Sequence, residues 1–265
     1  VYLGEESYLL DDAECFEMGR LEQYSLTSDL ITHALAGVRP AERHEIIKAR
    51  GVLPHGTPGQ NLFTTLCADV ETFLSQAGVY LDSERLDPLS IDITAGEFRV
   101  VGTIEPVYRD RMVHFRYATI KAKDLLNAWI AHLLLNASRR PGYPGETIVV
   151  GGKADERQAY RFRPLDNAGD LILELLCFYW DGLSKPLHFF PEASLAYAQA
   201  VQNSRPGEDP LRAAEKRWKA GFGIPGEGEE AHLGFCFRSG PPLDREFEAA
   251  SLAVFGPLIG CREKV

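Results

Sequence analysis

The sequence has no long apolar run and no recognisable export signal. None of its stretches reaches the roughly 18 consecutive apolar residues that a membrane-spanning helix needs. The chain opens VYLGEESYLLDDAE, which has neither the basic segment nor the apolar segment of a secretory signal peptide. We therefore expect a cytoplasmic protein without a membrane contact. The start at VYL indicates a piece of a longer chain.

Cysteines are few, and no two of them form a recognisable pair. The five are widely separated and never arranged as C-x-x-C: Cys15, Cys67, Cys177, Cys236 and Cys261. This pattern disfavours a disulfide framework and a structural zinc site. We expect reduced thiols, with Cys67 and Cys177 buried as small apolar side chains on helix faces.

An excess of basic residues is also missing. The chain has 28 Lys and Arg against 38 Asp and Glu, which gives a net charge of −10 and a pI of about 5.2. A domain that holds nucleic acid by itself usually carries a basic face and a high pI. We therefore expect weak or no DNA binding by the isolated chain. Most local basic clusters, such as Lys216, Arg217 and Lys219, alternate with acidic residues and indicate solvated helix surface.

Several motifs of enzyme and cofactor sites are absent. The sequence contains no G-x-S-x-G nucleophile turn and no Walker-type or G-x-G-x-x-G phosphate loop. The segment GFGIPGEG (221–228) has glycines but no lysine, and we interpret it as a surface loop. No histidine pairs with a Cys or carboxylate at metal-ligand spacing, so His114 and His132 are expected at the surface or as satisfied core residues. The sequence predicts no cofactor and no bound metal.

The hydrophobic pattern that is present predicts a helical N-terminal part. With 45% hydrophobic residues, the 265-residue chain can bury a substantial core. Helices are expected at 25–37, 40–50 and 60–76, with the Gly- and Pro-rich loop GVLPHGTPG (51–59) before the third. We expect a single domain over 1–265, in which residues 1–80 are a mainly helical lead-in.

Strand patterns dominate the middle of the chain, which is expected to form a sheet core with crossing helices over 85–190. Alternating residues predict an antiparallel meander of strands at 89–93, 97–105 and 112–119, followed by a helix from about 120 to 138. Strands 146–152 and 159–165 are expected to pair across KADER, before a helix at 166–182 and a strand at 186–190. Helices near 192–203, 209–220 and 243–256 make 191–265 mainly helical. The predicted class is α/β, with a mixed central sheet of about five strands flanked by helices.

One hairpin in this region has the layout of a metal-dependent nuclease site. Cleavage of a phosphodiester on such a scaffold needs two carboxylates to hold Mg²⁺ and a lysine beside the attacking water. GTIE (102–105), the turn YRDR and RYA (116–118) resemble the G-x-I-D and D-Y-K elements of RecB-type nuclease domains in the PD-(D/E)xK, or restriction-endonuclease-like, superfamily.

The same comparison shows why this site should be inactive. Glu105 stands at the first Asp, while Arg116 replaces the metal-binding Asp, and Tyr117 is followed by Ala118 in place of the lysine. The segment GRLEQYS (19–25) also lacks the histidine that those enzymes carry on their first helix. A misplaced unit charge at about 4 Å changes the energy by about 4 kcal/mol at an effective dielectric constant of about 20. We therefore predict no catalytic Mg²⁺ and an ion pair between Arg116 and Glu105 across the hairpin.

A wider resemblance covers residues 10 to 260. The chain is similar to the C-terminal domain family of RecC, the gamma chain of exodeoxyribonuclease V, in five blocks that occur in the same order: DDAECFEMGRLEQYSLTSDLITHAL, RPAERHEIIKARGVLPHGTPGQNLF, RYATIKAKDLLNAWIAHLLLNA, SKPLHFFPEASLAYAQA and FEAASLAVFGPLI. The resemblance implies a noncatalytic scaffold in an ATP-dependent helicase–nuclease that processes double-strand DNA breaks. It also implies the beta (RecB) and alpha (RecD) chains as partners, and DNA in the assembled complex. Chi recognition is expected in a part of such a chain that is absent here.

Two other functions remain open at this point. One is an active Mg²⁺-dependent nuclease that uses Glu105 with Asp92 or Glu97, and the other is a domain that only binds proteins. The run Phe178, Tyr179 and Trp180 bears on partners, because one helix face cannot bury all three side chains. Core packing is one explanation for these aromatic residues, and an apolar patch that a partner covers is the other.

Overall fold

The computed structural model describes residues 17–152, 158–203, 208–219, 221, 225–238, 240 and 242–265. Cys15, the whole predicted KADER turn and part of the GFGIPGEG segment lie outside these residues. The chain divides into two compact units between Val79 and Tyr80, with residues 152–156 outside the second. The expectation of one domain over the whole chain stays a prediction.

The first unit is helical, as the sequence predicts. Its α-helices are α1 (Arg20–Leu35), α2 (His44–Ala49) and α3 (Thr57–Ala77), with a 3₁₀ turn at Pro40–Arg43. Helices α1 and α3 pack together, and their apolar faces are buried at Leu30 and Val70, for example. In the first turn of α3, a Cβ at Gly59 would lie 1.9 Å from the carbonyl oxygen of Pro54, so only glycine fits there.

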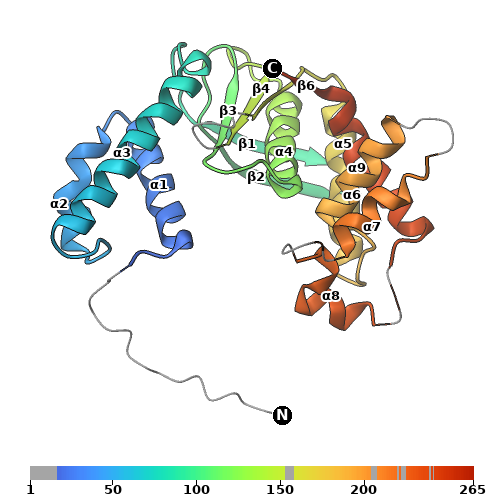
Figure 1. The fold of residues 1–265 in the computed structure, drawn as a ribbon. Coiled ribbons are helices and arrows are strands. Elements are labelled where there is room, and N and C mark those ends of the chain that lie inside the picture. Colours follow the sequence, from blue (N-terminus) through green and yellow to red (C-terminus); the bar gives the residue numbers. More distant parts are fainter. Residues whose placement is uncertain are drawn as a thin grey trace. The chain divides into compact units, whose positions relative to one another are not determined.

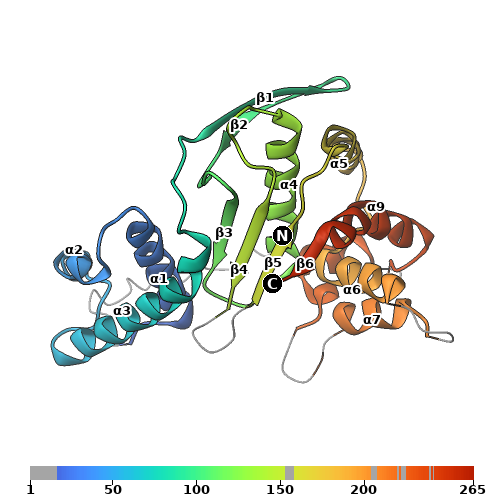
Figure 2. The same cartoon turned by 90° about the horizontal axis from the view of Figure 1, so that it is seen from above.

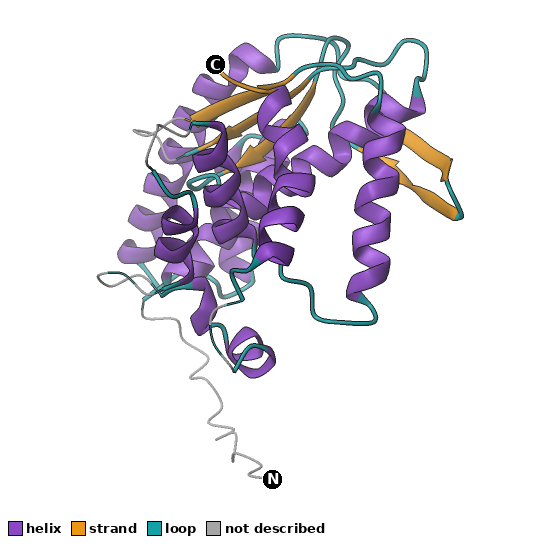
Figure 3. Ribbon diagram, turned by 90° about the vertical axis from the view of Figure 1, so that its right-hand side faces the viewer, coloured by secondary structure: helices purple, strands orange, loops and turns teal. Residues whose placement is uncertain are grey.

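The second unit contains two sheets instead of one. Strands β1 (Leu89–Ala95) and β2 (Phe98–Ile104) form an antiparallel hairpin of their own. The larger sheet has the order β3-β4-β5-β6, with bounds Met112–Arg116, Thr147–Gly151, Gln158–Phe162 and Arg262–Lys264. Figure 3 shows the hairpin apart from the four-stranded sheet. The α/β class is confirmed, but the single central sheet is wrong.

The predicted three-stranded meander is therefore wrong at its third strand. β3 pairs with β4, in parallel, and does not extend the hairpin. Parallel neighbours need a crossover, which helix α4 (Ala122–Ser138) supplies between them. Every residue of β4 is buried, as expected for an inner strand with both faces covered.

The predicted strand at 186–190 is also wrong. The backbone N–H of Phe190 donates to Ser194 Oγ at 3.2 Å, an arrangement that begins helix α6 (Pro191–Gln202) and leaves no N–H for a sheet ladder. The fourth strand is β6, which follows the last helix, α9 (Arg245–Cys261), and was not predicted. Helix α9 also continues beyond the predicted end at residue 256.

One large core lies between the four-stranded sheet and the helices that cover it. Trp129 on α4, Phe162 on β5 and Phe255 on α9 are almost fully buried in this core. Figure 1 shows α4 beside the sheet, with α5 (Ala168–Gly182), α6 and α9 grouped next to it. β1 contacts both α4 and α5 (Figure 2). Among the residues that the structure describes, no helix is long and apolar enough to span a membrane.

A second group of aromatic residues joins the C-terminal helices. Phe190 packs against Trp218 and Phe247, with ring centroids 4.5 and 6.1 Å away. The other helices of this group are α7 (Leu211–Trp218) and α8 (Ala231–Cys236), with a 3₁₀ turn at Glu227–Glu229. The 3₁₀ turn begins inside the segment 221–228 that the sequence predicts as a surface loop, and helix α8, which follows it, was not predicted.

The cysteine predictions are confirmed in part. Cys67, Cys177, Cys236 and Cys261 are free thiols in the structure. Cys67 is buried as predicted, and burial raises its pKa. Cys177, however, is exposed, because only the first half of α5 packs on the core.

Candidate functional site

The positions that match the nuclease motif lie on separate sheets. Glu105 follows the last residue of β2, whereas Arg116 is the last residue of β3 and is followed by Tyr117 and Ala118. Glu105 is exposed and pairs with Arg85, with 3.5 Å between the carboxylate oxygen and the guanidinium nitrogen. The predicted ion pair between Arg116 and Glu105 is therefore wrong.

Arg116 is instead held by the first turn of α4. Its Nη1 donates to Asp124 Oδ1, and its Nε donates to the carbonyl oxygen of Thr119 at 3.1 Å. The second oxygen of Asp124 accepts the backbone N–H of Lys121 at 2.7 Å, which caps the helix. The side chains of Arg116 and Asp124 are only 20% and 17% exposed. The end of β3 therefore carries a guanidinium, and this guanidinium is paired with the carboxylate of Asp124.

The alternative metal ligands are not assembled either. Asp92 on β1 and Arg99 on β2 form a bidentate ion pair, in which Nε and Nη2 of Arg99 donate to the two carboxylate oxygens at 2.8 and 2.7 Å. The hydrogen bonds from Arg99 lower the pKa of Asp92. Glu97 lies in the turn of the same hairpin. Within the described ranges, no group of three or more His, Cys, Asp and Glu side chains could hold a metal ion.

Two further carboxylates cap the first turns of α4 and α6. Glu192 accepts the backbone N–H of Ala122, the first residue of α4, at 3.0 Å. Glu227 accepts the N–H groups of Glu192 and Ala193 at 3.2 and 2.9 Å, at the start of α6. Burial raises the pKa of Glu227, while these two amides act in the opposite direction. Both carboxylates satisfy amides that a helix leaves without an internal partner.

A cavity of about 660 Å³ adjoins these caps. Its charged lining is balanced: four basic residues (Lys121, Lys216, Arg217 and Lys219) face four acidic ones (Glu192, Glu227, Glu229 and Glu230). Lys219 is also paired with Glu215 at 3.1 Å. A cavity with this composition lacks both the concentrated negative charge that holds Mg²⁺ and the concentrated positive charge that holds DNA phosphates.

Two histidines lie between α4 and the sheet; His132 is buried and His114 is half-buried, and neither environment was specifically predicted. His132 is fully buried, and its ring nitrogens lie 2.8 Å from Thr147 Oγ1 and 3.0 Å from the carbonyl oxygen of Arg163. His114 on β3 has a buried Nε2 with no hydrogen-bond partner. Burial lowers the pKa of each ring to about 4, so both are neutral at pH 7. The satisfied-core prediction is confirmed for His132 only.

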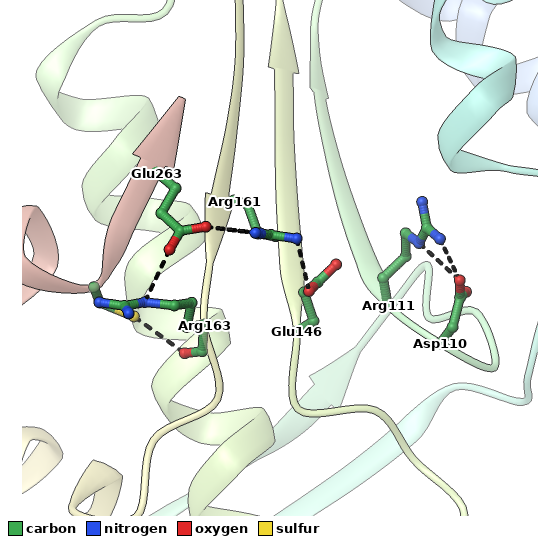
Figure 4. A network of polar contacts seen from close by, with 7 residues as sticks. Asp110, Arg111, Glu146, Arg161, Arg163 and Glu263 are labelled. Carbon is green, nitrogen blue, oxygen red and sulfur yellow. Dashed lines mark hydrogen bonds and ion pairs between the residues drawn. The ribbon is translucent and has the colours of Figure 1, made fainter. Parts of the chain in front are cut away.

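The polar groups at the other side of the sheet are mutually paired. Arg161 on β5 lies opposite Glu263 on β6 and donates to its carboxylate at 2.5 and 3.1 Å. Arg163 contacts the second oxygen of Glu263 at 3.4 Å, and Arg161 also approaches Glu146 at 3.9 Å (Figure 4). The bonds from Arg161 lower the pKa of Glu263. This network attaches the C-terminal strand to the sheet and has the features of a structural element.

Comparison with known proteins assigns the family. The model of the RecC C-terminal domain matches residues 1–202 of this chain. The chain belongs to the RecC C-terminal domain family. "RecBCD enzyme subunit RecC" of Mycolicibacterium smegmatis is 30% identical over 84% of this chain and 20% of its own length. The protein of the same name in Mycobacterium tuberculosis H37Rv is 25% identical over the same shares, and that of Escherichia coli K12 is 25% identical over 74% of this chain and 17% of its own.

The matches cover only a small part of each relative. The chain spans about a fifth of the length of the curated RecC relatives. The recognition based on five sequence blocks is confirmed.

Of the residues around Arg116, sequence reasoning missed Asp124. Its position as the third residue of an apolar helix is nevertheless a sequence signal for a capping carboxylate.

Proposed function

We propose that the chain is a noncatalytic, nuclease-like scaffold domain of a bacterial ATP-dependent helicase–nuclease. The complex would process double-strand DNA breaks for recombinational repair in the cytoplasm. The main support is the state of Arg116, which takes the place of a metal-binding carboxylate and is neutralised by Asp124. A guanidinium there repels a divalent cation and leaves no free carboxylate beside it. The domain needs no cofactor of its own.

The family relationship supports the partners in this proposal. The relatives are named as RecC subunits of the RecBCD enzyme, so the beta (RecB) and alpha (RecD) chains are the proposed partners. The domain would hold these subunits and help to separate or channel DNA strands in the assembled complex. The negative net charge of −10 supports weak or no DNA binding by the isolated chain.

A nuclease assay tests the noncatalytic part of the proposal. We expect the purified chain to leave single- and double-stranded DNA intact in Mg²⁺ or Mn²⁺, because no carboxylate pair is available beside Arg116. Glu105→Ala serves as the matched variant, since this exposed residue is the remaining acidic motif position. Reproducible cleavage that disappears in Glu105→Ala would overturn the proposal and favour the active nuclease.

A second experiment addresses the scaffold and DNA-channelling roles. We expect the chain, as part of a full gamma subunit, to co-purify with the alpha and beta chains and to cross-link to forked DNA in the complete assembly. Co-purification without any DNA cross-link would favour a domain that binds only proteins. Absence of co-purification would contradict the scaffold role itself.

A further inference from the structure

Helix α5 is rich in apolar residues, but few of its side chains are buried. Only Ala168, Leu171 and Ile172 of its 15 residues are buried, whereas α4 buries seven of 17. Leu175 and Leu176 still pack against the core, but at the C-terminal end of α5 the side chains of Tyr179, Trp180 and Leu183 are 64%, 61% and 63% exposed. Large apolar side chains that gather at an exposed surface mark a site where another molecule binds, so this end of α5 is a candidate interaction surface.

A groove runs between this part of α5 and helix α9. It encloses about 560 Å³, and its apolar lining consists of Leu173, Cys177 and Phe178 of α5 with Ala253 of α9. Such grooves between helices commonly accept the apolar face of a third helix. The exposed Cys177 and half-buried Phe178 lie within it, so the groove is open to solvent in the isolated chain.

Three carboxylates surround the groove: Asp170, Glu174 and Asp181. None of their side chains makes a hydrogen bond or ion pair within the part of the chain that the structure describes. Their positions i, i+4 and i+11 place them along one side of α5 over about 16 Å, at 1.5 Å per residue. Cations at matching positions on a partner would therefore meet all three.

The charge of the groove selects the class of partner. The nearby aromatic side chains could stack on bases, but a nucleic acid would bring its phosphates beside three carboxylates. Each phosphate beside a carboxylate would be repelled, which disfavours a nucleic acid as the partner. Residues 1–16 of this chain are excluded as the cover for the same reason, because they contain five acidic residues and no lysine or arginine.

We propose that the groove between α5 and α9 binds an amphipathic helix of a separate protein chain. The apolar face of that helix packs on Leu173, Cys177 and Phe178, and its flanking lysines or arginines pair with the three carboxylates. This inference deepens the proposed scaffold role and rests on it. DNA cleavage by the chain would contradict the scaffold role but leave peptide binding unaffected, so the two can fail separately.

Peptide binding to the purified 265-residue chain tests the inference. The probe is a fluorescein-labelled helical peptide of 18 residues with leucine at i, i+3, i+4 and i+7 and lysine at the flanking positions. A twin peptide carries glutamate instead of lysine. We expect saturable binding of the lysine peptide, and binding of the glutamate twin at least about tenfold weaker, because attraction becomes repulsion. Fluorescence anisotropy measures both dissociation constants.

A matched pair of charge reversals locates the binding site. Glu174→Lys with Asp181→Lys should weaken the lysine peptide at least about tenfold. Glu208→Lys with Glu229→Lys makes the same change in net charge at exposed positions outside the groove and should change binding less than about twofold. Circular dichroism confirms that both variants are folded.

Three results would overturn the inference. The first is failure of the lysine peptide to bind, and the second is equal weakening by the two reversals. The third is preferential binding of a single-stranded oligonucleotide that the Glu174 and Asp181 reversals strengthen, which would identify a nucleic-acid surface.

Discussion

We expect the second unit to lose about 4 kcal/mol of stability when the pH falls from 8 to 5. The two histidines between α4 and the sheet are responsible, because burial lowers the pKa of each to about 4 from an unfolded value of 6.5. Between these values the unfolded chain binds more protons, so stability falls as the pH falls. At pH 5, this difference corresponds to about 2 kcal/mol for each ring.

Glu227 opposes the histidines, because burial raises its pKa and the folded chain therefore takes up this proton more readily than the unfolded chain as the pH falls. Two other carboxylates act in a lower pH range. Glu263 and Asp92 have lowered pKa values because arginines hold their charged forms. A carboxylate of this kind contributes stability above its unfolded pKa and loses it only below about pH 4.5. The window from pH 6.5 to 5 therefore reports mainly on the histidines. Urea denaturation at several pH values, followed by far-ultraviolet circular dichroism, measures the effect.

Substitutions separate the two rings. His114→Leu should remove about half of the pH dependence with little loss of stability at pH 8, because its buried Nε2 has no partner to lose. His132→Leu should also reduce the pH dependence but destabilise the protein at pH 8, since the buried hydroxyl of Thr147 loses its partner and the carbonyl oxygen of Arg163 keeps only the thiol of Cys261. His232→Ala is the exposed control. Equal stability of the unaltered chain at pH 8 and pH 5 would contradict the assignment.

Asp124→Ala should destabilise the second unit by about 3 kcal/mol. The substitution leaves the largely buried guanidinium of Arg116 without its counter-charge, and removal of one partner from a buried pair is costly. It also leaves the N–H of Lys121 without its cap. Urea denaturation at pH 7.5 gives the change in free energy of unfolding.

A double substitution distinguishes the stranded charge from a general effect of the helix cap. Arg116→Met combined with Asp124→Ala should be more stable than Asp124→Ala alone, because no unpaired charge remains. Glu105→Ala should change stability by less than about 0.5 kcal/mol, since Glu105 and Arg85 are exposed and 3.5 Å apart. A double variant no more stable than Asp124→Ala would show that the stranded charge is not the cause.

These expectations give the degenerate motif a structural meaning. In an active site of the expected type, the end of this strand would hold a metal with carboxylates. Here the end of β3 carries Arg116, which donates to the carboxylate of Asp124. Asp124 therefore stabilises the fold by pairing with the positive charge of Arg116. We expect a site with this bonding to hold no metal, because the guanidinium also donates to Thr119.

The sequence by itself determined the local elements and the residues that differ from the nuclease motif. Apolar residues three and four positions apart predicted α1, α3 and α4, and alternation predicted the β1–β2 hairpin, because these patterns depend only on near neighbours along the chain. The replacements Arg116 and Ala118 are visible without coordinates. The five ordered blocks were also sufficient to recognise the RecC family.

Only the tertiary structure decided which distant segments meet. β3 pairs with β4 because α4 covers the inner face of both strands, and β6 joins β5 from about 100 residues away in sequence. The partner of Arg116 followed from that arrangement, which places α4 and not Glu105 beside the end of β3. The charge state of His114 and the exposure of Trp180 likewise depend on packing, which is a property of surfaces brought together by folding and not of any local pattern.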